Sequence, residues 1–251
     1  MMHKSSTAQV LICQTSALPA AVTLGESAID LRWNHVADFS ASDLVRLESF
    51  LSPPELDHVS AAKTEVERKT RLVARALLKD ELGRRTGTQA ARLELLTTPA
   101  GKPFLPSTSD RPVWFSLAHS HGWIVHAFSD RLEIGVDLEH INRGHITHEL
   151  LQDVLTKEEQ ALTAALPEAE RATKFFQYWT AKESVLKAAG AGFSGLHDLT
   201  EEDCSSFSCF GKSWKTMTLT APSGFVAALA WEDEPVLSQR QGQDERPRAP
   251  V

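Results

Sequence analysis

Residues 113–139 read VWFSLAHSHGWIVHAFSDRLEIGVDLE, and this stretch predicts three consecutive strands. Apolar and polar side chains alternate on both sides of His121 and Gly122, a pattern that predicts a hairpin turning at that pair. The run 132–139, LEIGVDLE, alternates in the same way and predicts a third strand. Short strands in direct succession are typical of an antiparallel sheet.

Helical patterns flank these strands on both sides. Residues 52–87 read as two helical pieces, the second ending near Gly83 or Gly87. A short strand and a Pro/Gly-rich loop follow over 93–112, and a late strand is predicted over 223–232. Two further helical segments are expected, over 146–164 and over 167–190, separated by Pro167. Strands followed by helices predict an α+β fold, with a seam near 129–131 and a polar, disordered tail over 238–251.

Composition places the chain among ordinary soluble globular proteins. Its 251 residues are 42% hydrophobic and 24% charged, with a net charge of −7. No run of 18 apolar residues exists, so a membrane span is not expected. The stretch 8–22 is faintly similar to a secretory signal but is interrupted by polar residues, and a short peripheral strand is the preferred interpretation. Three cysteines without metal-ligand spacing favour reduced thiols and a cytoplasmic location.

Two acids lie on one face of the strand 134–139, IGVDLE. Alternation directs Ile134, Val136 and Leu138 into the core, with Asp137 and Glu139 on the opposite face. The carboxylates are then about 6–7 Å apart along the strand and could converge on one hard cation. A half-exposed strand with two solvated acids would produce the same pattern, so this motif alone decides nothing.

Charged side chains interrupt the apolar stripe of the helical segment 175–190, FFQYWTAKESVLKAAG. Lys182 falls in the stripe itself, and Glu183 and Lys187 follow Trp179 at helical spacing beside it. Glu183 and Lys187 could form a surface ion pair, and Lys182 could extend its ammonium group out to solvent. The functional alternative is that the stripe ends at the floor of a cleft, where the lysines meet phosphate and Glu183 meets the cation.

A basic stripe marks the earlier helix. Residues 63–85 carry eight basic side chains against four acidic ones, whereas residues 133–170 carry nine acidic against two basic. The stripe consists of Arg68, Arg71, Arg75 and Lys79. It is either the solvated side of an amphipathic helix or a phosphate-binding surface. Acids for Mg²⁺ together with several cations for phosphate are suited to attack on a diphosphate.

IGVDLE followed about forty residues later by WTAKESVLK resembles the paired signature of the 4′-phosphopantetheinyl transferases. The resemblance extends to AGKPFLP, FSLAHS and RLVARALLK, and so covers roughly residues 60–195. It points to the monomeric, surfactin-synthetase-activating type, in which two similar α/β halves are fused in tandem as a pseudo-dimer. Each half is a small antiparallel sheet packed with helices, and the active site lies at the interface between them. The halves here would be 1–129, with the elements that bind coenzyme A phosphates, and 130–237, with the metal-binding and catalytic elements.

The resemblance implies transfer of the phosphopantetheine arm of coenzyme A to a serine of an apo acyl or peptidyl carrier protein. It assigns Mg²⁺, with Mn²⁺ as an alternative, to Asp137, Glu139 and Glu183, and catalysis to Glu183 and Lys187. The expected contacts to coenzyme A are Arg75, Lys102, His119, Ser120, Lys182 and Lys187. Trp179 and Glu159 would support the site.

Two positions depart from the family pattern, which often reads FN-x-SHS where this chain has FSLAHS. Ser116 replaces asparagine and Ala118 replaces serine, so one phosphate contact is expected to be lost at position 118.

Other functions fit the sequence less well. A Mg²⁺-dependent phosphodiesterase or pyrophosphatase acting on a nucleotide-like diphosphate is the alternative enzyme, because the same acids and cations would serve it. A serine hydrolase is disfavoured because FSLAHSHG lacks the GxSxG elbow. A binding module without catalysis would have had no need to keep the acids. The acidic balance and the basic helix without interleaved aromatic residues argue against a nucleic-acid partner.

Overall fold

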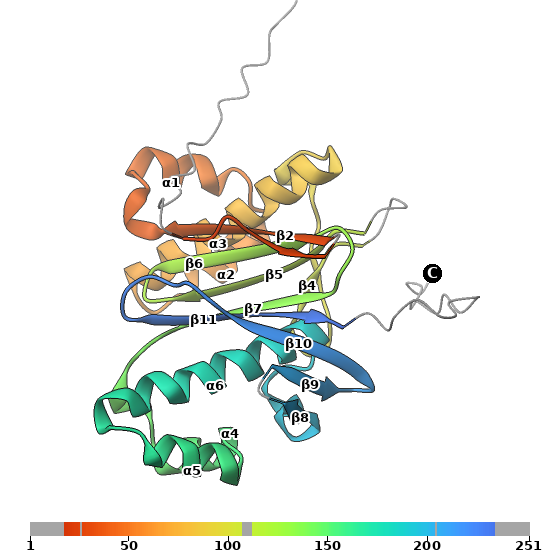
Figure 1. The fold of residues 1–251 in the computed structure, drawn as a ribbon. Helices are drawn as coiled ribbons and strands as arrows, with labels where there is room; N and C mark the ends of the chain where they lie inside the picture. Colours follow the sequence, from red (N-terminus) through yellow and green to blue (C-terminus); the bar gives the residue numbers. More distant parts are fainter. Residues whose placement is uncertain (1–17, 26, 107–111, 204, 234–251) are drawn as a thin grey trace, which may run out of the picture.

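The computed structural model describes residues 18–25, 27–106, 112–203 and 205–233. Their strands form two antiparallel sheets and a small hairpin (Figure 1). The first sheet has the order β1-β2-β6-β5, the second β7-β11-β10-β9-β8, and β3 pairs with β4. The strands of the first sheet are β1 (Ala21–Leu24), β2 (Ser27–His35), β5 (Trp114–Ser120) and β6 (Trp123–Ser129). Those of the second are β7 (Ile134–His140), β8 (Thr200–Asp203), β9 (Ser206–Cys209), β10 (Lys212–Leu219) and β11 (Phe225–Glu232), and the hairpin joins β3 (Leu96–Thr97) to β4 (Pro103–Phe104).

The predicted hairpin is confirmed. Strand β5 pairs with β6 in register from Trp114 opposite Ser129 to Ser120 opposite Trp123. His121 and Gly122 both have positive φ, 48° and 83°, as the tight turn of a two-residue hairpin requires.

The two sheets share one apolar core. Alternate residues of β2, β5 and β6 face alternate residues of β7, β10 and β11, among them Leu31, Val125, Val136 and Leu229. Strand β5 also runs beside β7, where side-chain hydroxyls rather than a backbone ladder join them. The Val136 amide donates to Ser116 Oγ at 3.0 Å, and the His140 amide donates to Ser120 Oγ at 3.2 Å.

Each sheet is covered on its outer face by one long helix. Helix α3 (Glu65–Thr86) packs on the first sheet with buried Leu72, Val73 and Leu77, and α6 (Glu168–Ala189) packs on β7 and β11. Both helices end at a glycine in the left-handed conformation, Gly87 and Gly190, as helix C-termini commonly do. The other α-helices of the described residues are α1 (Ala41–Glu48), α2 (Pro53–Ser60), α4 (His148–Val154) and α5 (Lys157–Ala165).

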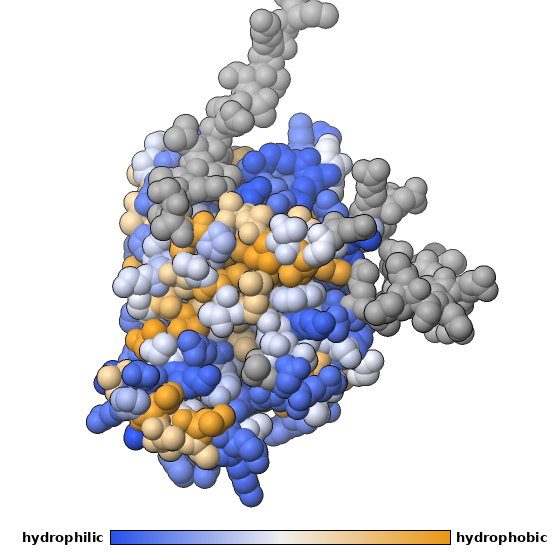
Figure 2. Space-filling view, viewed as in Figure 1, coloured by the Kyte–Doolittle hydropathy of each residue, from blue (hydrophilic) through white to orange (hydrophobic). Residues whose placement is uncertain are grey.

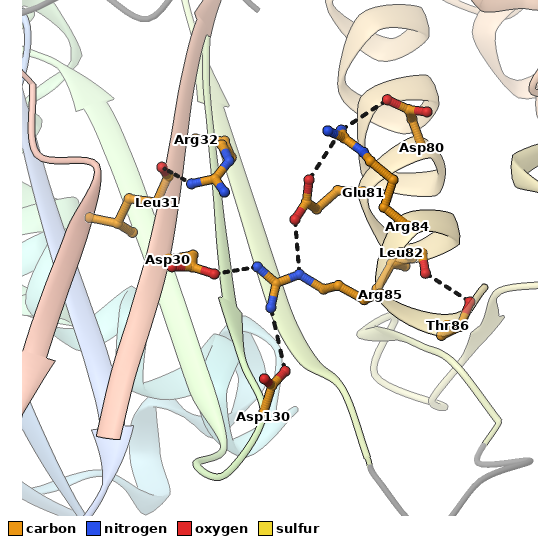
Figure 3. A network of polar contacts seen from close by, with 10 residues as sticks. All are labelled: Asp30, Leu31, Arg32, Asp80, Glu81, Leu82, Arg84, Arg85, Thr86 and Asp130. Atoms are coloured by element: carbon orange, nitrogen blue, oxygen red, sulfur yellow. Dashed lines mark hydrogen bonds and ion pairs between the residues drawn. The ribbon is translucent and has the colours of Figure 1, made fainter. Parts of the chain in front are cut away.

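An ionic network attaches the C-terminal end of α3 to the first sheet (Figure 3). Arg85 lies at its centre, donating to Glu81 on its own helix at 3.0 Å, to Asp30 on β2 and to Asp130 after β6. Because Arg85 is largely buried and satisfies three carboxylates with one planar group, it fixes α3 against β2.

Gly135 allows α6 to approach β7 closely. A Cβ atom at this position would lie 2.0 Å from the Ser184 carbonyl oxygen and 2.5 Å from the Ala188 amide nitrogen. The face of β7 that carries Asp137 and Glu139 is therefore pressed against the helix that carries Glu183 and Lys187.

We expect Gly135→Ala to lower the free energy of unfolding by about 2 kcal/mol, because α6 must move away from the strand. Urea denaturation measures this loss. Gly144→Ala is the matched control, since a Cβ there meets nothing closer than 3.4 Å. An alanine at 135 that left stability at the control's level would contradict the close packing described here.

Several sequence predictions are confirmed and others are corrected. The helices over 52–87 and the strand over 223–232 form as α2, α3 and β11. The single helix expected over 146–164 is instead two, because Leu155 is extended and Thr156 caps a new helix.

Strand β2, helix α1 and strands β8 to β10 were not predicted. The peripheral strand expected over 8–22 falls mostly outside the described residues, and so does the polar tail 238–251. Among the helices described, none is long and apolar enough to cross a bilayer.

Candidate functional site

A cluster of charged side chains lies where β7 faces α6. Asp137 and Glu139 project from alternate positions of β7, and Glu183 and Lys187 from successive turns of α6. Lys187 Nζ donates to Asp137 Oδ1 at 2.6 Å. The sequence prediction that Ile134, Val136 and Leu138 face the apolar core while the acids face away is confirmed.

The carboxylates of this cluster disturb one another electrostatically. Burial, and then the negative charge of Asp137, raise the pKa of Glu139 to about 7, although the Ser120 hydroxyl and Lys187 oppose the shift. Burial and Asp137 likewise raise the pKa of Glu183, again against Lys187. Three acids share one nearby ammonium group, so the cluster has an excess of negative charge that a cation would relieve.

The cluster offers the oxygen donors that a hard divalent cation prefers. Asp137 is 4% exposed, and its Oδ2 has no hydrogen-bond partner among the described residues. Unsatisfied buried carboxylate oxygens are unusual, and two further carboxylates lie nearby. As the side chains stand, no three acids, imidazoles or thiolates of the described chain are arranged to hold a metal ion, and Lys187 takes one oxygen of Asp137. The donor set fits Mg²⁺ chemically, provided that Lys187 gives up that oxygen.

The end of β5 adds polar and basic groups to the same region. Ser120 Oγ donates to Glu139 Oε2 at 3.2 Å. The pKa of His119 is lowered by loss of solvation and then by the positive charges of Lys187 and Arg71. His119 therefore lies near both α6 and α3, although its side chain is still partly open to solvent. Arg71 was seen in the sequence only as part of the basic stripe and was not predicted as a site residue.

Lys182 lies in the interior of the protein. It is 5% exposed, and its Nζ donates to the Val154 carbonyl at 2.9 Å and to Glu159 Oε2. Glu159 is 3% exposed and also caps α5 by accepting from the Thr156 amide at 2.7 Å. Lys182 and Glu159 thus form a buried ion pair between α6 and α5. Its ammonium group is therefore occupied in the interior, and a contact of Lys182 with the diphosphate stays a prediction.

Lys102 contacts the C-terminal end of α6, and Trp179 lies on the same helix one turn before Glu183. Lys102 Nζ donates to the Ala188 carbonyl at 2.6 Å, and burial lowers its pKa. Its role toward coenzyme A stays a prediction. Trp179 packs on Phe175 with ring centroids 6.2 Å apart, and its supporting role stays a prediction.

The two positions that depart from the family pattern have structural roles. Ser116 accepts the Val136 amide at the junction of the sheets. Ala118 is 3% exposed and belongs to the shared apolar core. The side chain at position 118 therefore faces the core and could not reach a phosphate group. The expectation that alanine at this position removes a phosphate contact was wrong.

The basic stripe of α3 is largely neutralised by acids. Arg68 pairs with Glu65, and Arg71 pairs with Glu67. Glu55 of α2 receives both Arg75 Nε and Lys79 Nζ at 2.7 Å, and the Lys79 side chain is completely buried. Arg75 and Lys79 therefore serve to hold α2 on α3, and a phosphate contact by Arg75 stays a prediction.

We expect Glu55→Gln to lower the free energy of unfolding at neutral pH by about 3 kcal/mol. Burial alone would raise the pKa of Glu55, but hydrogen bonds from Lys79, the Ser52 amide and Arg75 outweigh it and lower the pKa from 4.5 to about 2. A depressed pKa stabilises the folded state above the unfolded value, so this contribution disappears as the pH falls from about 4.5 to about 2. The gap between wild type and variant should close over that window in urea titrations. Glu65→Gln, at an exposed position, should show no comparable gap, and a gap that does not change with pH would contradict the ion-pair account.

A cavity of about 570 Å³ lies on a different face of α6 from Glu183 and Lys187. Its lining from α6 consists of Lys174, Gln177, Tyr178 and Ala181, spaced as one helical face. No local sequence pattern indicates this cavity, because its walls come from α5, α6 and β8 to β10.

Comparison with known proteins agrees with this picture. The sequence profile of the 4′-phosphopantetheinyl transferase superfamily matches residues 133–240. The chain is 27% identical over 217 residues to the 4′-phosphopantetheinyl transferase HetI of Nostoc sp., an alignment that covers 84% of this chain and 91% of HetI. It is 28% identical over 158 residues to a phosphopantetheinyl transferase of Thraustochytrium sp., covering 59% of this chain and 55% of the relative.

A third relative is the 4′-phosphopantetheinyl transferase Sfp of Bacillus subtilis, 27% identical over 149 residues, covering 59% of this chain and 64% of Sfp. The chain spans less than two thirds of the length of the last two relatives. Residues 133–240, which hold the carboxylate cluster, are thus similar to the 4′-phosphopantetheinyl transferase superfamily.

Proposed function

We propose that this protein transfers the 4′-phosphopantetheine arm of coenzyme A to a serine of an apo acyl or peptidyl carrier protein, releasing adenosine 3′,5′-bisphosphate. The observation that carries the proposal is the convergence of Asp137, Glu139, Glu183 and Lys187 between β7 and α6. These are the groups of the superfamily signature, contributed by two segments about forty residues apart in the sequence.

Asp137, Glu139 and Glu183 would hold Mg²⁺, or Mn²⁺ in its place. When bound, the cation would neutralise the negative charge of the coenzyme A diphosphate. Two facts support the assignment: the unpartnered Oδ2 of Asp137 and the raised pKa values of Glu139 and Glu183.

The chain's own residues then have separable tasks. The serine hydroxyl attacks the β-phosphorus of coenzyme A, and the bond from that phosphorus to the oxygen shared with the adenosine half breaks. Glu183 accepts the serine proton, directly or through a water molecule. Burial raises its pKa and so makes it a stronger base, whereas holding the cation would make it a weaker one, which favours the route through water. Lys187 leaves Asp137 and stabilises charge on the phosphate oxygens. His119 and Ser120 hold the coenzyme A phosphates from the end of β5, with Arg71 close to His119.

The arrangement of the sheets supports a tandem organisation. One half consists of β2, β6 and β5 under α3, the other of β7, β11 and β10 under α6. The site draws residues from β5 on one side and from β7 and α6 on the other, so we place it between the halves and expect the protein to act as a monomer.

Docking of a carrier protein requires local surface, because carriers are usually acidic and this chain has a net charge of −7. Partly buried apolar residues lie just beyond the metal-binding strand, at Ile141, Ile146, Leu150 and Leu151. Figure 2 shows hydrophobic residues gathered over the end of the molecule formed by α4 and α5. We propose this surface for hydrophobic contact with the carrier.

The decisive experiment is the intact mass of apo carrier proteins after incubation with the enzyme, coenzyme A and Mg²⁺. We expect a gain of one phosphopantetheine, and no gain when all divalent metal is chelated. Release of phosphopantetheine into solution without any carrier would instead establish the alternative phosphodiesterase. Transfer undiminished by chelation would refute the metal assignment.

A further inference from the structure

The cavity of about 570 Å³ beside α6 has a markedly acidic lining. Its walls come from α5, from the face of α6 that carries Tyr178, and from β8, β9 and β10. The acids that line it are Glu158, Glu159, Glu201, Glu202 and Asp203, against one lysine, Lys174.

The most buried acid of this cavity, Glu159, has a hydrogen-bond partner on only one of its two carboxylate oxygens. Glu159 Oε2 accepts the Thr156 amide and Lys182 Nζ, but the other oxygen, Oε1, has no hydrogen-bond partner in the described part of the chain. Glu159 is only 3% exposed, so water cannot readily take the place of the missing hydrogen-bond partner. Glu201 of β8 faces it, and burial, then the charge of Glu159 and a hydrogen bond between the two carboxyl groups when Glu201 is protonated, raise the pKa of Glu201.

Two facing carboxyl groups can be stabilised in two ways. They can share a proton, or they can hold a cation between them. Lys182 supplies one positive charge to the pair from inside the protein, which leaves one negative charge uncompensated when both acids are ionised. The three further acids at the cavity wall add negative potential, which favours a cation at the pair as well as a proton.

The remaining walls are suited to an aliphatic chain attached to the cation. Leu162, Phe207 and Met217 contribute apolar surface, and Leu162 is 60% exposed although it borders the cavity. The ring of Tyr178 already carries a positive group on its face, because Lys174 Nζ lies 4.4 Å from the ring centroid. A cationic group is thus stable at this wall in the protein itself.

We propose that this cavity binds a small organic ammonium ion, with its charged nitrogen between Glu159 Oε1 and Glu201 and its aliphatic part against Phe207 and Met217. The site lies on a different face of α6 from the carboxylate cluster, and its charge excludes phosphates and acidic carrier proteins. It is therefore separate from the site that binds coenzyme A.

The sequence provides selective reporters for this cavity. Tyr178 is the single tyrosine of the chain, and Met217 is the only methionine besides Met1 and Met2. Both line the cavity. Protein labelled with ¹³C at tyrosine and at methionine methyl groups can therefore be titrated with n-butylammonium and 1,4-diaminobutane at constant ionic strength. The neutral n-butanol and the anionic butyrate serve as matched ligand controls.

We expect saturable shifts of the Tyr178 and Met217 signals with the two ammonium compounds and none with n-butanol or butyrate. Glu201→Gln should weaken the binding about tenfold, because it removes one of the two charges at the floor. Glu94→Gln, an exposed acid in the other half of the chain, should leave the affinity unchanged. Ala181→Leu, which puts a larger side chain into the cavity, is an independent test if Glu201→Gln perturbs folding.

If the Tyr178 and Met217 signals did not saturate with the ammonium compounds, or responded equally to n-butanol, the proposal would be overturned. The remaining explanation would then be a proton shared between the carboxyl groups of Glu159 and Glu201. An affinity unaffected by both Glu201→Gln and Ala181→Leu would also overturn it. None of these readouts uses coenzyme A or a carrier protein, so the result is independent of the proposed transferase activity.

Discussion

Replacement of Glu183 by glutamine is expected to lower the rate of phosphopantetheine transfer by about 100-fold or more. The substitution removes both a proton acceptor and one of three candidate metal ligands while preserving the size of the side chain. Coenzyme A affinity should fall much less, because Lys187, His119 and Ser120 stay in place. Single-turnover transfer to a carrier protein and direct titration with coenzyme A separate the two effects.

Glu170→Gln is the control on the same helix, since Glu170 is an exposed acid of the first turn of α6. It should transfer at the wild-type rate. A Glu183→Gln enzyme as fast as this control would remove Glu183 from the mechanism, and an equal loss of coenzyme A affinity and of transfer would indicate a binding role alone.

Lys182→Met is expected to lower the free energy of unfolding by about 3–5 kcal/mol, because it leaves the carboxylate of Glu159 buried without its cation. The double variant Lys182→Met/Glu159→Gln should recover part of this loss, since it removes the unpaired charge. Urea denaturation of the two variants and of Glu159→Gln gives the coupling between the residues.

Lys174→Met is the control, because Lys174 lies on the same helix but outside the buried pair. If Lys182→Met retained full stability and lost only coenzyme A affinity, the phosphate contact inferred from the sequence would be restored. A loss of stability without recovery in the double variant would show that packing, and not the buried charge, is the cause.

The strands and helices that carry the cluster could be predicted because their patterns are local. Alternation in 134–139 predicts which face Asp137 occupies, and helical spacing places Glu183 and Lys187 on successive turns. Both inferences need only neighbouring residues. Strand β2 was missed although its apolar and polar residues alternate and it pairs with the preceding strand β1. Strands β8 and β9 are only four residues long and β10 is largely exposed, so their patterns are weak even though each pairs with its neighbour in the chain.

The partner of Lys182 could not be predicted from a local pattern. Its position in an apolar stripe is correctly read from the sequence as unusual, but its partner is Glu159, 23 residues earlier on another helix. Sequence periodicity predicts which face of a helix a side chain occupies, but it does not predict the residue that the side chain contacts. Arg71, the inward-facing Ala118 and the acidic cavity depend likewise on the packing of separate elements, which no local pattern records.

The apolar core shared by the two sheets has a consequence for biosynthesis. The inner face of the first sheet, with Leu31, Val125 and Ala127, is covered by residues made later, up to Leu229. At ribosomal speed the roughly 100 residues that separate Ala127 from Leu229 take about 5–20 s to be added. During that interval the emerging chain carries an uncovered apolar surface, the kind of surface that makes an unfinished chain prone to aggregation.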